Sequence, residues 1–241
     1  VGTIGDIGTF STIQMKHMTT AEGGVTITND DDLGRKAQLF ASRGAVFEKR
    51  EGLYWREHIL LAPNYRMTEL QAAIGLAQLK KLRSSVDHRA KSATMLTQLI
   101  KHAEGVSPIP TIDGVKHSYW MYGVLLDNER LDVSVYEFAQ ALNAELACEF
   151  FVPREYYNLC TQTVFREKKI FKCRSVGEHV RYGEGICPNA EKFLRRVITA
   201  LWNPHLEDSD VQDIATAVKK VATFYASRRQ MQGTRRTSGP E

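Results

Sequence analysis

The chain has 241 residues, of which 43% are hydrophobic and 25% are charged, a balance typical of a globular protein. No apolar run reaches the roughly 20 residues that span a bilayer, so we expect no membrane-spanning segment. The formal net charge of +4 is small and comes partly from arginines near the C-terminus, so we expect no nucleic-acid partner.

The first ten residues are already apolar and punctuated by glycine, and the chain begins with Val1 rather than methionine. No secretory or transit signal is visible, which favours a cytoplasmic protein. We therefore expect the sequence to begin inside a domain, with an N-terminal portion of that domain missing.

The first third of the chain predicts a strand, a helix and a loop before a long helix. Residues 25–28 alternate after two glycines, which indicates a strand, and Asn29–Asp32 supply a cap and an acidic first turn for a helix. Residues 45–63 are rich in charged and aromatic side chains and are interpreted as a long ordered loop. A long helix, or a kinked pair, is predicted over 68–104, beginning with a capping box at Thr68–Gln71.

After residue 105 the pattern predicts a separate small α/β unit, followed by a disordered basic tail over 227–241. Its predicted elements, in chain order, are a strand over 118–126, a helix capped by Ser134 and Glu137, a strand over 147–152, a helix from Pro188 to Leu201 and a helix capped by Ser209 and Gln212.

The cysteines give no sign of a metal site. They form no C-x-x-C pair, and the seven histidines show no ligand pattern, so neither a zinc site nor a redox dithiol is predicted. We expect free thiols in a reducing compartment at all four positions, Cys148, Cys160, Cys173 and Cys187.

Lys16 lies in a loop between two predicted strands, among hydroxyl, carboxylate and glycine residues. A lysine held out of bulk water beside an anionic ligand loses part of its preference for the charged form, and the neutral amine is a nucleophile. A solvated surface charge is the alternative for a single lysine, so the neighbouring motifs decide between the two.

Several segments accompany Lys16 in a fixed order: Phe10-Ser11, Thr19-Thr20-Ala21-Glu22-Gly23-Gly24, Thr28-Asn29-Asp30 and Asn64-Tyr65-Arg66-Met67-Thr68-Glu69-Leu70-Gln71-Ala72-Ala73. With the order of elements, they resemble the DegT/DnrJ/EryC1/StrS family of fold-type-I, pyridoxal-phosphate-dependent aminotransferases. Weaker similarity occurs at 117–120 and 187–191, and the resemblance spans residues 1 to about 222.

The resemblance implies an α/β fold of the fold-type-I transferase kind, with a partial large domain and a small C-terminal α/β domain. Residues 1–67 would be the remnant of the large cofactor-binding domain, 68–104 the connecting helix and 105–226 the small domain. The tail over 227–241 would lie outside both.

The resemblance also implies roles for three residues. Lys16 would bind pyridoxal 5'-phosphate covalently and later move a proton between substrate and cofactor. Ser11 would donate its hydroxyl to the cofactor phosphate, which needs neutral donors as well as charge. Asn64 would reach the same phosphate from the neighbouring subunit, so we expect a homodimer with shared active sites.

Two departures from the family pattern matter. Ala21 stands where the family has glycine, and a positive φ there would cost about 1 kcal/mol. The aromatic residue that stacks on the pyridine ring and the carboxylate that pairs with its nitrogen would both lie upstream of Val1. We therefore expect this chain to be inactive alone.

The expected activity is transfer of an amino group from glutamate or glutamine to a nucleotide-linked keto-sugar or keto-cyclitol. One alternative is a degenerate transferase body that binds a ligand or regulates a partner. Another is a cofactor-dependent sugar dehydratase, a relative in which histidine replaces the lysine; Lys16 favours transamination, although His17 lies beside it.

Overall fold

The computed structural model describes residues 2–153, 157–168 and 179–237, with side chains described as far as residue 229. The chain divides into two compact units, unit 1 (Val1–Ser85) and unit 2 (Val86–Glu241). The division falls inside one continuous helix, α2 (Glu69–Ile100), where the sequence predicts a connector over 68–104. Domain boundaries at residues 67, 104 and 226 stay predictions.

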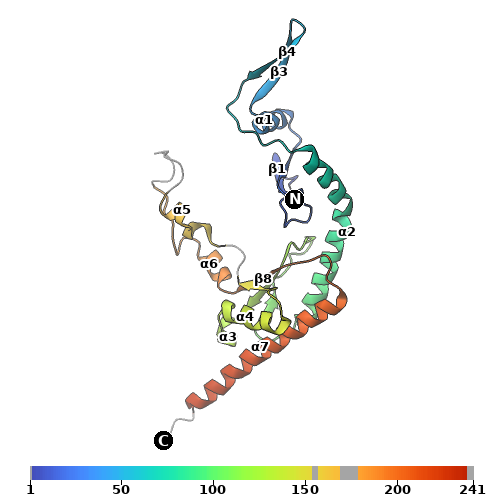
Figure 1. The fold of residues 1–241 in the computed structure, drawn as a ribbon. Coiled ribbons are helices and arrows are strands. Elements are labelled where there is room, and N and C mark those ends of the chain that lie inside the picture. The colour runs from blue at the N-terminus through green and yellow to red at the C-terminus, as the bar shows by residue number, and fades with distance from the viewer. Residues whose placement is uncertain (1, 154–156, 169–178, 238–241) are drawn as a thin grey trace. The chain divides into compact units, whose positions relative to one another are not determined.

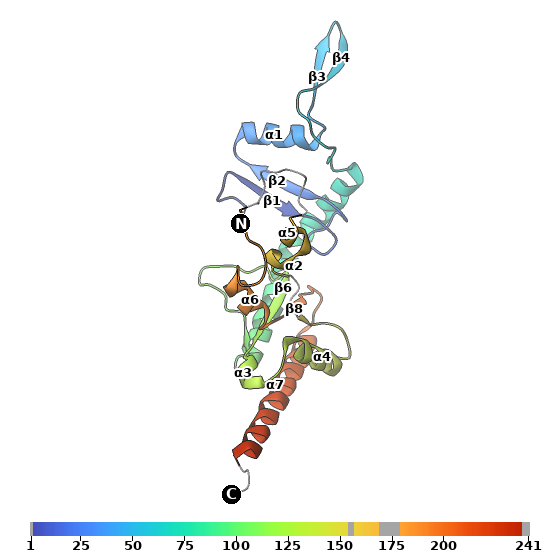
Figure 2. The same cartoon turned by 90° about the vertical axis from the view of Figure 1, so that its left-hand side faces the viewer.

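Unit 1 begins with an antiparallel hairpin of β1 (Ile7–Ser11) and β2 (Gly24–Thr28), joined by the loop that carries Lys16. Helix α1 (Asp31–Ala41) follows β2 and lies beside the hairpin (Figure 2). The side chain of Asp30 accepts a hydrogen bond from the backbone N–H of Leu33, so the predicted cap and acidic first turn are confirmed.

The prediction of a loop over 45–63 is wrong for most of that segment. It forms a second antiparallel hairpin, β3 (Ala45–Arg50) and β4 (Leu53–His58), which extends beyond α1 within unit 1 (Figure 2). Glu51 and Gly52 connect the strands with φ values of 52° and 83°, as a two-residue hairpin turn requires. Because β4 is exposed throughout and β3 is exposed after Val46, no alternation of polar and apolar residues revealed the two strands.

Unit 2 is built on a four-stranded antiparallel sheet in the order β5-β6-β8-β7. The strands are β5 (Val106–Pro108), β6 (Met121–Leu126), β7 (Val152–Pro153) and β8 (Val197–Leu201). The helices of this unit, besides the second part of α2, are α3 (Asn128–Leu131), α4 (Val135–Leu146), α5 (Thr163–Arg166), α6 (Pro188–Leu194) and α7 (Asp208–Thr237), with a 3-10 turn η1 (Leu159–Thr161). Figure 1 shows α4 beside α7 below the sheet.

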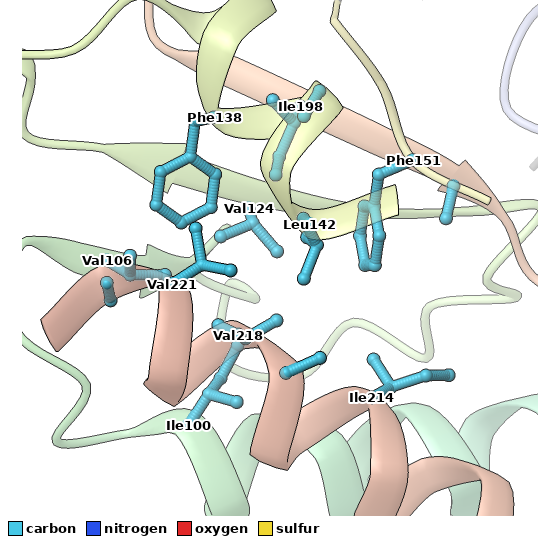
Figure 3. Close-up of a cluster of buried hydrophobic side chains, with 14 of the residues drawn as sticks. Ile100, Val106, Val124, Phe138, Leu142, Phe151, Ile198, Ile214, Val218 and Val221 are labelled. Carbon is cyan, nitrogen blue, oxygen red and sulfur yellow. The ribbon is translucent and has the colours of Figure 1, made fainter. Parts of the chain in front are cut away.

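The hydrophobic core lies between the sheet and the helices α2, α4 and α7 (Figure 3). Every second residue of β6 points into it, and one face of α7 is buried, with Val211, Ile214, Ala215, Val218 and Ala222. The labelled side chains that meet there are Ile100, Val106, Val124, Phe138, Leu142, Phe151, Ile198, Ile214, Val218 and Val221. Burial on this scale stabilises unit 2 by roughly 25 cal/mol per Å² of apolar surface.

Trp202 and Tyr122 attach the second part of α2 to the sheet. The indole N–H of Trp202 donates to Ser92 Oγ at 2.9 Å, and the Tyr122 hydroxyl lies 2.9 Å from Thr97 Oγ1. Both aromatic side chains are almost completely buried, which requires a partner for each polar atom. The second part of α2 therefore packs on the core of unit 2 through its buried residues Ser92, Ala93, Leu96 and Ile100.

The structure confirms the capping box of Ser134 and Glu137 at the start of α4, but the strand predicted over 147–152 is wrong except at its end. Ala147 ends α4 with a left-handed backbone. The side chain of Asn143 then accepts from the N–H groups of Phe150 and Phe151 and donates to the Phe151 carbonyl. These bonds satisfy backbone groups that a strand would have paired, so regular pairing begins only at Val152.

The helix predicted from Pro188 to Leu201 ends early. Helix α6 stops at Leu194, and Val197–Leu201 forms β8, the strand that pairs with both β6 and β7. The apolar residues in this segment fit both periods, and the β-branched run Val197-Ile198-Thr199 favours the strand.

Helix α7 begins at Asp208, one residue before the predicted cap, because the carboxylate of Asp210 accepts from the N–H of Glu207. It continues to Thr237, so the prediction of a disordered tail from residue 227 differs from the structure over 227–237. Arginine, glutamine and methionine are good helix formers, and they extend a helix already packed through Ala226. Residues 238–241 lie outside the described residues.

Candidate active site

Lys16 and Ser11 lie at the same end of the β1–β2 hairpin. The backbone N–H of Ile13 donates to Ser11 Oγ at 3.4 Å, and the N–H of Lys16 donates to the Ile13 carbonyl at 3.0 Å. These bonds form a turn directly after β1, with the Ser11 side chain exposed and Lys16 half-buried. The structure thus places a hydroxyl and a primary amine on one turn.

A pair of buried threonines holds the loop closed. The hydroxyl groups of Thr12 and Thr20 lie 2.7 Å apart, and the Thr20 N–H donates to the Thr12 carbonyl at 2.8 Å. The Thr12 N–H donates to the carbonyl of Gly23, and Thr20 Oγ1 donates to that of Glu22. Sequence reasoning missed this clamp, whose signal is two threonines four residues before and four after Lys16.

The backbone of the loop confirms the strain expected at Ala21. Its φ is 66°, in the left-handed region that favours glycine, so the alanine costs about 1 kcal/mol there. Gly23 has a φ of 142°, and a Cβ added to it would lie 2.9 Å from Thr20 Oγ1 and 3.1 Å from Thr12 Oγ1. Gly23 is therefore required by the threonine clamp.

The second motif contacts the lysine loop directly within unit 1. The side-chain amide of Gln71 donates to the Glu22 carbonyl at 2.8 Å, while its oxygen accepts from Thr68 in the predicted capping box. Gly75 on the next turn of α2 leaves room for the methyl group of Thr20, since a Cβ there would lie 3.0 Å from it. The first turns of α2 thus support the loop from one side.

Asn64 occupies a different place. It forms a β-bridge with Ser42, and its Oδ1 accepts from Arg66 Nε at 3.1 Å. These partners, Ser42 and Arg66, both lie outside the lysine loop. The side chain of Asn64 is exposed.

Neither a metal centre nor a membrane span emerges from the described residues. No group of three or more His, Cys, Asp or Glu side chains among them could hold a metal ion, and no described helix is long and apolar enough to cross a bilayer.

The architecture is that of fold-type-I aminotransferases. It matches the solved structure of the putative sugar aminotransferase Spr1654 from Streptococcus pneumoniae in its pyridoxal-phosphate form, with a TM-score of 0.73 and 21% identity. The match covers 93% of this chain and 53% of that one.

Residues 1–219 match the DegT/DnrJ/EryC1/StrS aminotransferase family, and the chain belongs to that family. The GDP-perosamine synthase of Vibrio cholerae is 38% identical over 132 residues, which are 54% of this chain and 34% of that protein. The L-glutamine:2-deoxy-scyllo-inosose aminotransferase of Streptoalloteichus tenebrarius is 29% identical, covering 95% of this chain and 56% of that protein. The chain spans about half the length of the curated relatives that it matches over most of its own length.

Aminotransferases of this family use pyridoxal phosphate. The cofactor presents an aldehyde and a phosphate, and the turn after β1 carries a primary amine and an exposed hydroxyl that suit these two groups. The residues present therefore fit the cofactor.

Proposed function

We propose that this chain is the lysine-bearing part of a pyridoxal-phosphate-dependent aminotransferase. The observation that carries the proposal is the turn that places Ser11 and Lys16 together on a loop clamped by Thr12 and Thr20. A solvated surface lysine needs no such support. The contact between Gln71 and Glu22 adds a second, independent restraint on the same loop.

Each of the three candidate residues has a distinct task. Lys16 would hold the cofactor through its Nζ and would move a proton at the substrate carbon. Ser11 donates its hydroxyl to the phosphate. The bound cofactor supplies the electron sink, and the protein supplies binding, orientation and proton transfer.

Asn64 acts across a dimer interface in this proposal. Arg66 occupies its Oδ1, so the amide N–H groups are the part of the side chain that serves an anion such as phosphate. A homodimer with shared active sites follows, in which each subunit lends Asn64 to the other.

The substrate class rests on the relatives. One is a GDP-perosamine synthase and another an aminotransferase for a keto-cyclitol that takes its amino group from glutamine. We infer a nucleotide-linked keto-sugar or a keto-cyclitol as acceptor and glutamate or glutamine as donor, in a cytoplasmic pathway of sugar biosynthesis.

The test uses the protein expressed from its gene with any residues that the reading frame encodes before Val1. With pyridoxal phosphate bound, addition of glutamate or glutamine should remove the visible absorption band of the lysine-bound cofactor. The variant Lys16→Ala should lack that band and lose at least about a thousandfold in turnover, because no other primary amine replaces it. Borohydride reduction followed by peptide mapping should place the cofactor on Lys16.

The matched control is Lys36→Ala, which removes an exposed lysine on α1 and should leave band and turnover unchanged. Wild-type turnover by Lys16→Ala, or a cofactor trapped on another lysine, would contradict the assignment. Failure of the protein to bind the cofactor at all would favour a regulatory role instead.

A further inference from the structure

Cys160 and Cys187 lie in contact although they are 27 positions apart in the sequence. Their sulfur atoms are 3.5 Å from each other, Cys160 in η1 and Cys187 at the residue that precedes α6. Both are free thiols and half-buried, so a small solute reaches them. A disulfide bond needs a sulfur–sulfur distance of about 2.05 Å, which is a side-chain adjustment of about 1.5 Å from this contact.

A hydrogen-bond network holds the two cysteine segments together. The Oδ1 of Asn158 accepts from the Cys160 N–H at 3.1 Å, and its Nδ2 donates to the Glu191 carboxylate at 3.4 Å. The same carboxylate oxygen accepts from the N–H of Gly185 at 2.8 Å. Asn158 and Glu191 therefore connect η1 to α6 independently of the sulfurs and fix the distance between them.

The contact also affects the acidity of Cys187. The hydrogen bond to Cys160 is the main reason why the pKa of the Cys187 thiol is raised, with burial and the charges of Cys160 and Glu191 adding to it. Either thiol can serve as the hydrogen-bond donor in this contact. A thiolate is the form that reacts with oxidants.

We propose that Cys160 and Cys187 form a peroxide-sensitive dithiol, in which oxidation links η1 to the start of α6 by an intramolecular disulfide bond. The proposal is independent of the function assigned to Lys16. It differs from the expectation from the sequence, because spacing along the chain gave no sign of the contact that the fold creates between two free thiols.

The reaction needs one molecule of hydrogen peroxide. The thiolate of one of the two cysteines attacks one peroxide oxygen, the O–O bond breaks, and the other oxygen leaves as hydroxide and becomes water. The resulting sulfenic acid is attacked by the sulfur of the other cysteine, the S–S bond forms, and the S–O bond breaks with loss of a second water. Two electrons pass from the two sulfurs to the peroxide.

The experiment treats the reduced 241-residue chain with hydrogen peroxide, blocks the remaining thiols with N-ethylmaleimide and maps the peptides before reduction. We expect the number of free thiols to fall from four to two, with one cross-linked peptide pair that joins Cys160 to Cys187. The yield should not depend on protein concentration, and dithiothreitol should restore all four thiols.

Two variants give matched controls. Cys187→Ser should lose the cross-link and leave Cys160 as a sulfenic acid that dimedone traps; serine is favoured before a helix, so α6 is retained, which circular dichroism checks. Cys148→Ser removes an exposed thiol and should leave the rate of cross-linking within about twofold of wild type. In concentrated urea the preference for a disulfide bond between Cys160 and Cys187 should vanish, and several different cysteine pairings should form instead.

Wild-type protein decides the matter even if a variant fails to fold. A cross-link through Cys148 or through Cys173, which lies outside the described residues, would overturn the proposal. Four free thiols after peroxide treatment that does oxidise the denatured chain would overturn it as well.

Discussion

The protonation of Tyr122 is coupled to folding. Burial raises the pKa of its hydroxyl to about 12, with the hydrogen bond to Thr97 acting in the opposite direction and Tyr119 adding to the rise. Because the folded state has the higher pKa, the neutral hydroxyl stabilises the fold fully below the ordinary pKa of about 10. That contribution, about 3 kcal/mol, is lost as the pH rises from about 10 to about 12.

The prediction compares wild type with Tyr122→Phe in urea unfolding at neutral and at alkaline pH. At neutral pH the variant should be less stable by about 1 kcal/mol, because it lacks one hydrogen bond while Thr97 keeps its bond to the Ala93 carbonyl. Above pH 10 the wild type should lose stability faster, so the difference should shrink or change sign. A constant difference across that range would show that Tyr122 does not titrate on unfolding.

At the same scale, the sequence pointed to candidate site residues but not to the residues that support their loop. Lys16 and Ser11 became candidates through the resemblance to the aminotransferase family, and so did Ala21, whose φ is positive as expected for a position that is usually glycine. Thr12 and Thr20 did not become candidates, because a hydroxyl in a loop has many partners open to it until the loop closes.

Helix α4 ends at Ala147, whose backbone conformation is unfavourable for alanine. Ala147 adopts a φ of 52° and a ψ of 26°, a left-handed conformation that costs alanine roughly 1–2 kcal/mol. Glycine adopts it freely but loses more backbone entropy on folding. Since Ala147 is exposed, Ala147→Gly should raise the free energy of unfolding by about 0.5–1 kcal/mol, measured by urea denaturation.

Ala144→Gly is the matched control for that change. Ala144 is also exposed but lies inside α4, where glycine should lower the stability by about 1 kcal/mol. Opposite signs for the two variants would show that the backbone conformation, rather than the loss of a methyl group, determines the effect. Equal destabilisation by both would contradict a left-handed end at Ala147.

At the scale of elements, predictions succeeded where a local signal is complete within a few residues. The capping boxes at Thr68 and Ser134 are such signals. The predictions failed where a distant partner determines the secondary structure. Residues 197–201 are such a case, because they form the strand β8 by pairing with β6. The β3–β4 hairpin is a third case: its turn at Gly52 is local, but its charged strands look like a loop.

The two units differ in how they are stabilised. Every hydrophobic side chain that is buried among the described residues belongs to the range 93–226, in unit 2. Unit 1 exposes large apolar side chains instead, including Ile4 at 95%, Leu61 at 98% and Leu70 at 79%. A surface of this kind normally contacts further protein, and the curated relatives are about twice as long as this chain. Unit 1 therefore carries the proposed chemistry on the less stable part of the chain.

Hydrogen exchange on the 241-residue chain tests this difference. Amides of β6, β8 and the buried part of α7 should exchange only through unfolding of the whole core of unit 2. Amides of β1, β2 and the β3–β4 hairpin should exchange at least about a hundredfold faster, since no large apolar cluster resists their opening. The variant Leu142→Ala, which removes a fully buried side chain of α4, should accelerate exchange in unit 2 and leave the hairpins unchanged. Equal protection of both units would mean that unit 1 has a stabilising core of its own. Faster exchange in both units of Leu142→Ala would mean that the two units unfold as one and share the core of unit 2.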